Sequence, residues 1–131
     1  MSTTQLKIVF VGLFFLFMFL FGFWLSRNGK PYNMALFTMH KLIALGAVVY
    51  LVLTIAKIHQ ATPLTPIQFT AVIITALCFV VTAATGAMLS VDKVMPEIVH
   101  RMHQITPYLT VLSTGATLYL LLIASKNLIK I

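Results

Sequence analysis

Acidic side chains are almost missing from this sequence: Asp92 and Glu97 are the only two among 131 residues. Charged residues of both signs make up 8% of the chain, whereas apolar residues make up 60%. This balance excludes an ordinary soluble domain, and the high apolar fraction also excludes a disordered chain. A proton-coupled carrier normally places an ionisable side chain near the middle of the membrane, whereas both acids here fall in or beside a predicted loop. The shortage of acids therefore argues against a transporter of protons or metal cations.

Cysteine is represented only by Cys78, which cannot form a disulfide within the chain. Long polar segments are also missing, because the connections near residues 26–33, 57–66 and 92–99 have only eight to ten residues each. Connections of this length leave no room for a second domain. The sequence therefore predicts a single transmembrane domain over residues 1–131.

Apolar stretches fill most of the chain, and four of them are long enough to cross a bilayer: residues 8–25, 34–56, 67–91 and 104–125. A run of roughly 18 apolar residues matches a hydrocarbon core of about 30 Å. Helices are expected at about residues 6–26, 32–60, 66–91 and 96–127. Short connections make successive helices antiparallel neighbours, so the predicted fold is an all-α, integral membrane, up-down-up-down four-helix bundle. An even number of spans would place both termini on the same side.

The net charge of +7 does not indicate a nucleic-acid-binding protein, because the nine lysines and arginines are spread over both predicted membrane faces. Contact with lipid headgroups explains such a distribution, so the lipid bilayer is the expected partner. One face would carry four of these cations: Lys7, Lys57, Lys126 and Lys130. The other face would carry five: Arg27, Lys30, Lys41, Lys93 and Arg101. This even division favours neither orientation under the positive-inside rule.

The first apolar stretch is rich in phenylalanine, with seven of the ten phenylalanines of the chain between residues 8 and 25. It is too long for the apolar region of a signal peptide, and no small-x-small cleavage pattern follows it before Arg27. Its only hydrogen-bonding side chain is the indole of Trp24, which suits a membrane interface. We therefore expect a retained helix that faces lipid.

Polar side chains inside a membrane span are costly, so the few that are present are the first candidates for function. Three histidines, His40, His100 and His103, are predicted near one membrane face, and His59 near the other. The second and fourth predicted helices run in the same direction and would be diagonal partners in an up-down bundle. Counted from Pro31 and Pro96, near the predicted helix starts, His40 and His103 would lie about 14 and 11 Å into their helices. At this similar depth, the two imidazoles can point at one shared site.

A pair of facing imidazoles in an apolar bundle suits haem b, whose iron takes imidazole nitrogens as axial ligands. The predicted metal ligands are His40 and His103, and His100 lies one helical turn from His103. Haem also carries two propionates, which need cations or water. Lys41 and Arg101 each stand beside the candidate ligands at the same face and can pair with these carboxylates. The sequence thus predicts one haem site near the face that carries the first and third connections.

In architecture the whole chain resembles the small four-helix membrane cytochromes of the cytochrome b and cytochrome b561 type. In residues the resemblance is carried by two segments, Met39-His-Lys-Leu-Ile-Ala-Leu-Gly46 and His100-Arg-Met-His103. Members of that superfamily often take their axial histidines from the second and fourth helices of such a bundle. The resemblance implies that His40 and His103 are the axial ligands, with His100 as a substitute ligand or a neighbour of a propionate.

The resemblance also bears on the number of haems. Two-haem members usually carry a second histidine further along each ligand helix. Here His59 follows His40 by nineteen residues, and no histidine follows His103. This departure indicates one haem b. His59 is then expected to lie at the membrane interface and to bind no haem.

The predicted function is therefore electron transfer by one bis-histidine haem b, either as an electron carrier or as a small quinone-linked oxidoreductase. The expected redox partner is a quinone or another protein, and formation of an oligomer stays open. Two alternatives also stay open. One is a noncatalytic scaffold subunit of a larger membrane complex, and the other is a small cation transporter, which the shortage of acids disfavours.

Other interpretations of the histidines remain as well. Histidines at helix ends often lie in the interfacial zone, and basic residues beside them can simply contact lipid phosphates. Pro107 has no N–H to offer the carbonyl of His103, so a local bend is expected there, with space for a macrocycle. Four methionines are predicted toward the same face and make a His–Met ligated iron an alternative: Met39, Met88, Met95 and Met102.

Overall fold

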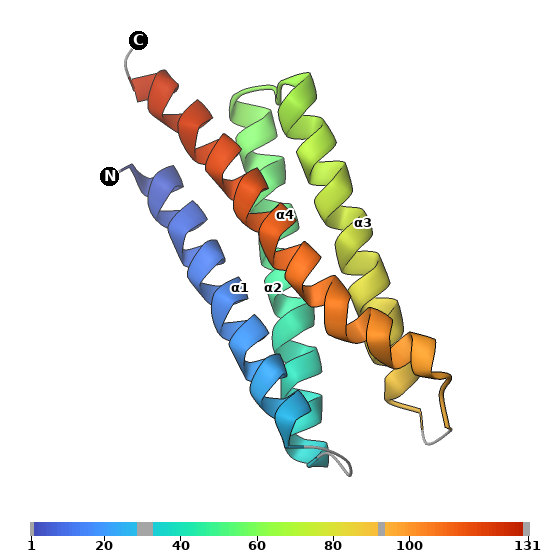
Figure 1. Ribbon diagram of the computed structural model, residues 1–131. Coiled ribbons are helices and arrows are strands. Elements are labelled where there is room, and N and C mark those ends of the chain that lie inside the picture. Colours follow the sequence, from blue (N-terminus) through green and yellow to red (C-terminus); the bar gives the residue numbers. More distant parts are fainter. Residues whose placement is uncertain (1, 29–32, 92–93, 130–131) are drawn as a thin grey trace. The chain divides into compact units, whose positions relative to one another are not determined.

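Four helices account for most of the computed structural model, which describes residues 2–28, 33–91 and 94–129 (Figure 1). They are α1 (Thr3–Arg27), α2 (Met34–Ala61), α3 (Pro66–Leu89) and α4 (Glu97–Ile129). No strand occurs within these described residues, so the all-α prediction is confirmed. The helix ends predicted from the sequence differ from the observed ones by at most three residues. The charged residues that lie outside the described part are Lys30, Asp92, Lys93 and Lys130.

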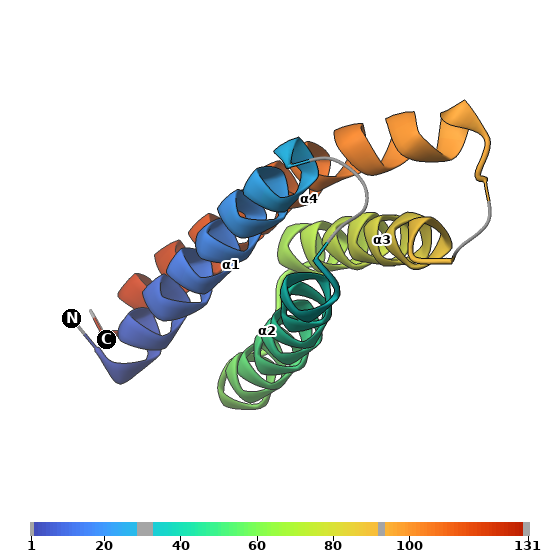
Figure 2. The same ribbon diagram turned by 90° about the horizontal axis from the view of Figure 1, so that it is seen from below.

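The helices are organised in two compact units. The first hairpin consists of α1 and α2, and the second hairpin consists of α3 and of α4 up to Ala124; the remainder of α4 groups with the first unit. Within each hairpin the two helices run antiparallel (Figures 1 and 2). The boundary between the units falls between Leu64 and Thr65, in the short connection after α2.

Each hairpin begins with the same type of helix cap. At α1 the Ser2 hydroxyl accepts a hydrogen bond from the Gln5 amide at 3.2 Å, and the Gln5 side chain accepts one from the Ser2 amide at 3.0 Å. Thr65 and Gln68 make the same reciprocal pair at α3, with distances of 3.4 and 3.0 Å. The Gln68 side-chain amide also donates to the Leu120 carbonyl of α4 at 3.3 Å. These caps satisfy N–H groups that a helix start leaves without partners, so both hairpins begin at a defined residue.

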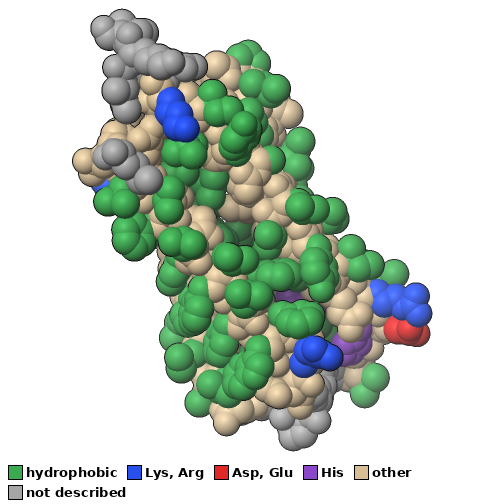
Figure 3. Space-filling view, turned by 60° about the vertical axis from the view of Figure 1, so that its left-hand side comes forward, with side chains coloured by type: hydrophobic (Ala, Val, Ile, Leu, Met, Phe, Trp, Pro, Cys, Tyr) green, Lys and Arg blue, Asp and Glu red, His purple; other side chains and the backbone are tan. Residues whose placement is uncertain are grey.

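All four helices are long and apolar enough to cross a membrane. Large apolar side chains remain exposed along them: on α1, Phe10, Phe17 and Trp24 are 60%, 56% and 50% exposed. Figure 3 shows hydrophobic side chains over most of the visible face, with the few charged groups toward its ends. Soluble proteins rarely expose contiguous apolar surface of this extent. The exterior of the helices therefore suits lipid rather than water.

The buried face of the first hairpin is mainly apolar. Buried residues recur every three or four positions on each helix, as expected for one face of an α-helix. On α1 and α2 they include Ile8, Val11, Phe15, Ala47 and Leu51. Van der Waals packing therefore stabilises this hairpin, because apolar residues gain little from leaving lipid for another apolar surface.

The buried face of the second hairpin is lined by hydroxyl groups instead. Thr75 on α3 and Thr117 on α4 share a hydrogen bond of 2.9 Å between their Oγ1 atoms. Thr82 and Thr110 form a second interhelical bond of the same length, nearer the connection between the helices. The hydrocarbon region has no water to satisfy such groups, so each bond both pairs two hydroxyls and holds α3 in register with α4.

The two hairpins bury equivalent positions. Residues that lie 63 or 64 positions apart in the sequence are less than a tenth exposed in both units: Gln5 and Gln68, Val11 and Thr75, Ala47 and Thr110, Leu51 and Thr114, and Thr54 and Thr117. The two hairpins therefore share one arrangement of buried positions. The second hairpin replaces several apolar residues of the buried face with threonine.

The Thr75–Thr117 bond allows a quantitative prediction. Valine at either position removes one hydroxyl at nearly constant volume and leaves the other without its interhelical partner. A double-mutant cycle of Thr75→Val and Thr117→Val, measured by reversible unfolding in detergent micelles, should give a coupling free energy of about 0.6 kcal/mol, with about 1.7 kcal/mol as the upper range. Thr70 provides the matched control, because its exposed hydroxyl bonds to the Pro66 carbonyl of its own helix. If Thr70→Val coupled to Thr117→Val as strongly, the interhelical hydrogen bond would not be the cause of the coupling free energy.

Candidate functional site

His103 lies on α4 and faces α3 within the second hairpin. Its Nδ1 atom is 3.0 Å from the hydroxyl oxygen of Thr85. The Cε1 edge of the ring lies over Gly86, where an added Cβ atom would come within 2.9 Å of Cε1. Real side chains do not pack that closely, so the imidazole occupies space that exists only because residue 86 has no side chain.

His40 has the corresponding place in the first hairpin. It lies on α2, and its imidazole covers Gly22 of α1, where an added Cβ would come within 2.8 Å of Cε1. The Phe21 ring lies beside it, with 5.8 Å between the ring centroids and an angle of 55° between the planes. His40 is therefore held against the α1 backbone by a glycine on one side and an aromatic neighbour on the other.

The two histidine–glycine contacts are equivalent positions of the repeated hairpin. Gly22 and Gly86 are 64 residues apart, and His40 and His103 are 63 apart. Both glycines open the pattern Gly-x-x-Leu-Ser, and both histidines directly follow a methionine. The sequence indicates the two histidines as candidates but does not predict their contacts with these glycines. The repeated pattern was the available signal, but glycine is common in membrane helices and does not by itself indicate a site.

Glycines on the partner helices of the two hairpins have different surroundings. Gly46 on α2 and Gly115 on α4 face open space, with no atom within 4 Å of an added Cβ. Of these four glycines, Gly22 and Gly86 alone contact a histidine. The contact is therefore a property of two particular positions rather than of glycine in these helices.

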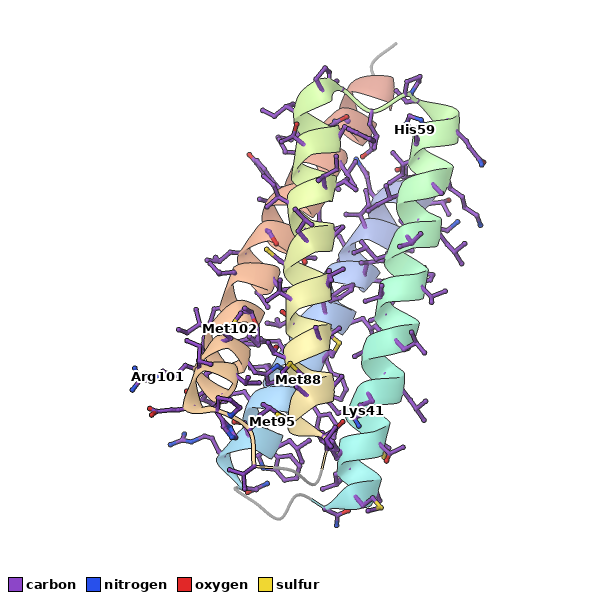
Figure 4. All side chains as sticks on the ribbon, turned by 90° about the vertical axis from the view of Figure 1, so that its right-hand side faces the viewer. Lys41, His59, Met88, Met95, Arg101 and Met102 are labelled. Carbon is purple, nitrogen blue, oxygen red and sulfur yellow. The ribbon has the colours of Figure 1, made fainter. Side chains whose placement is uncertain are left out.

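The other two histidines have different surroundings. His100 is half-buried on α4, one turn before His103. His59 lies at the end of α2 opposite to Lys41 (Figure 4), and its Nδ1 accepts a hydrogen bond from the Leu64 amide at 3.2 Å. This bond stabilises the connection after α2, so His59 has a structural role that requires no cofactor.

The two cations predicted beside haem propionates each contact a residue one turn earlier in their own helix. The Lys41 ammonium lies 4.4 Å from the centroid of the Phe37 ring, at cation–π distance. The Arg101 guanidinium donates to the Glu97 carboxylate at 2.7 and 3.0 Å, and Figure 4 shows Arg101 pointing away from α4. Exposed ion pairs of this type contribute little stability, so Arg101 can exchange Glu97 for another anion at small cost.

The methionines near this end of the hairpins are partly exposed. Figure 4 places Met88, Met95 and Met102 at the same end of the second hairpin. Met88 and Met102 are 42% and 40% exposed, and Met39 on α2 is 51% exposed. Their burial therefore gives no particular support to an iron site with a methionine ligand.

Within the described residues, no group of three or more histidine, cysteine, aspartate or glutamate side chains comes together as a metal site.

No family of known proteins, no curated protein and no solved structure matches this chain. The function is therefore inferred from the residues and their contacts.

Alanine at Gly22 or Gly86 should displace the histidine that packs on it. In a helix, alanine is normally more stable than glycine by about 0.5–1 kcal/mol. In Gly22→Ala and Gly86→Ala the new Cβ collides with the imidazole of His40 or His103, so this gain should be lost. The Cε1–H resonance of the affected histidine should also shift in NMR spectra of the protein in micelles.

Gly46→Ala and Gly115→Ala are the matched controls, because their Cβ atoms enter open space. Both should be as stable as the wild type or more stable, and should leave the histidine resonances in place. Similar shifts in all four variants would contradict the close packing of imidazole on glycine.

Proposed function

We propose that this protein is a membrane electron-transfer protein that holds one haem b between His40 and His103. The two hairpins would pack as one up-down-up-down bundle that crosses the membrane four times, with both termini on the same side. Each hairpin would contribute one axial imidazole to the iron.

The observation that carries this proposal is the repeated contact between a histidine and a glycine. One hairpin plan, used twice in the chain, yields two equivalent imidazoles, His40 over Gly22 and His103 over Gly86. The helices α2 and α4 have the same place in their hairpins and would cross a membrane in the same direction, so the histidines would lie at the same depth. Parallel repeats of this kind are commonly related by a twofold axis along the membrane normal. Such an axis would bring both imidazoles to one central iron.

The residues around both histidines are compatible with a flat, apolar macrocycle. Each glycine lets an imidazole lie directly against the neighbouring helix backbone, which would hold an axial ligand in a fixed position. Lys41 follows one proposed ligand directly, and Arg101 lies two residues before the other. These two cations would pair with the propionates, with His100 as their neighbour.

When bound, the haem would supply one redox-active iron that accepts or gives up a single electron. Coordination by two histidines leaves no open position on the iron, which favours electron transfer over reaction with oxygen. The chain would thus serve as an electron carrier or as a small quinone-linked oxidoreductase. A membrane quinone or a redox protein would be its partner.

Haem binding is the first test. The wild-type protein, produced with sufficient haem and purified in detergent, should be red and should contain one haem b per chain in a pyridine haemochrome assay. His40→Ala and His103→Ala should each abolish stable haem incorporation, because each removes one of the two axial ligands. A colourless wild-type protein would overturn the proposal in favour of a scaffold subunit or a transporter.

Two further variants serve as controls for the ligand assignment. His100→Ala should retain a six-coordinate, low-spin spectrum, and His59→Ala should leave the spectrum unchanged because His59 bonds to the Leu64 amide. Loss of haem in His100→Ala but not in His103→Ala would move the ligand one turn along α4. A reproducible ratio near two haems per chain would implicate His59.

The proposed propionate cations predict shifts of the reduction potential. Lys41→Ala should lower the potential, because loss of a cation near a propionate favours the oxidised, more positive iron. Arg101→Ala should lower it less, because Glu97 already compensates part of the Arg101 charge. Potentiometric titration in lipid nanodiscs measures the reduction potential of both variants. Lys57→Ala, near the other end of α2, is the control and should keep the wild-type potential. If Lys41→Ala and Arg101→Ala kept the wild-type potential, both cations would lie among lipid headgroups instead.

A further inference from the structure

Thr85 lies between His103 and two backbone carbonyls of its own helix. The residue is only 5% exposed. Its hydroxyl oxygen is 2.8 Å from the Val81 carbonyl oxygen, 3.1 Å from that of Thr82 and 3.0 Å from His103 Nδ1. Both carbonyls can only accept hydrogen bonds. The hydroxyl has a single proton for these three neighbours. Which neighbour receives that proton therefore decides whether Nδ1 of the neutral imidazole carries a proton or a lone pair.

The two arrangements of the hydroxyl proton differ in energy. If Thr85 donated to His103, its oxygen would face the Val81 carbonyl oxygen at 2.8 Å with no proton between them, which is unfavourable for buried groups. If Thr85 donates to the Val81 carbonyl, it makes the bond to residue i−4 that is common for threonine in membrane helices. Its lone pair then faces His103 Nδ1, and every contact is satisfied only when Nδ1 carries the imidazole proton.

We propose that Thr85 fixes neutral His103 as the Nδ1–H tautomer, so that Nε2 keeps its lone pair for a metal ion. The tautomer follows from the contacts of Thr85, whereas the identity of the metal as haem iron rests on the proposed function. Thr85 is then a positioning residue, because it acts on the ligand and not on the iron. A hydrogen bond to one ring nitrogen is the usual means by which proteins select the other nitrogen for a metal.

The equivalent position in the first hairpin carries a different residue. Phe21 lies 64 residues before Thr85, and its ring is next to His40, with 5.8 Å between the centroids. A phenyl ring provides no hydroxyl to accept from an imidazole N–H. An imidazole that donates its N–H to a fixed acceptor is the more basic ligand. Thr85 therefore strengthens the ligand from the second hairpin, and no threonine stands at the equivalent position of the first.

The tautomer can be measured in the full-length protein without haem. In protein labelled with 15N-histidine in detergent micelles, at a pH where the imidazoles are neutral, long-range 1H–15N correlations distinguish a protonated ring nitrogen from one with a free lone pair. His103→Gln identifies the signals of His103. Wild-type His103 should carry its proton on Nδ1.

Three threonine variants then test the cause. Thr85→Val keeps the volume but removes the hydroxyl that accepts from Nδ1, so the His103 tautomer should shift toward the Nε2–H form that imidazole side chains prefer in water. Thr85→Ser restores a hydroxyl and should restore the wild-type pattern. Thr70→Val, on the exposed side of α3, should leave the pattern unchanged. An Nε2–H form in the wild type, or a Thr85→Val spectrum identical to the wild type, would overturn the proposal for Thr85.

Addition of haem b to the same variants separates this proposal from the proposed function. Thr85→Val should retain haem about 10–100-fold less tightly than the wild type and Thr85→Ser, the usual effect of removing a hydrogen bond behind a metal ligand. Its reduction potential should rise, because a less basic ligand stabilises the oxidised iron less. If the wild type shows the Nδ1–H form and none of the variants binds haem, the assignment of Thr85 stands and the haem proposal fails. If haem binds equally to all of them, Thr85 does not position the ligand.

Discussion

The close approach of an imidazole to a helix backbone is the constraint on which both hairpins depend. A polar ring in the hydrocarbon region is costly unless another group covers it, and a neighbouring helix can cover it only where side chains leave space. Gly22 and Gly86 provide that space for His40 and His103, with Cε1 within 3 Å of where a Cβ would lie. Each contact also fixes the register of its hairpin, because a shift of one residue would bring a side chain against the ring. The same residues therefore determine both the packing and the position of the candidate ligands.

The two hairpins solve the packing problem in lipid by different means. Between membrane helices, apolar contact gains little over contact with lipid, so close packing and hydrogen bonds have to stabilise the interface. The first hairpin relies on packing along its apolar buried face. The second uses the Thr75–Thr117 and Thr82–Thr110 bonds, which are directional and tolerate little sliding of α3 against α4. A fixed register matters most in the second hairpin, because the hydrogen bond to His103 requires α3 to present a hydroxyl at one height.

The sequence predicts the helices well and the site only in part, for a physical reason. Long apolar runs between short polar connections allow few alternatives to membrane helices, so the predicted ends lie within three residues of the observed ones. His40 and His103 were also recognisable, because imidazoles are rare in such runs. The contacts of these histidines with Gly22, Gly86 and Thr85 were not recognisable, because they depend on which face each helix turns to its partner. Helices that are apolar all round carry no polar stripe that would reveal this face.

The repeated hairpin explains why the two histidines can have unequal surroundings. In a symmetric dimer of one hairpin, any residue behind one imidazole would also stand behind the other. In a tandem repeat, each copy can change independently while the shared glycine–histidine contact is kept. Phe21 beside His40 and Thr85 beside His103 occupy equivalent positions, yet one is apolar and the other carries a hydroxyl within hydrogen-bond distance of the imidazole. Two hairpins in a single chain can thus keep the same glycine–histidine contact and place different residues beside each imidazole, which identical subunits cannot do.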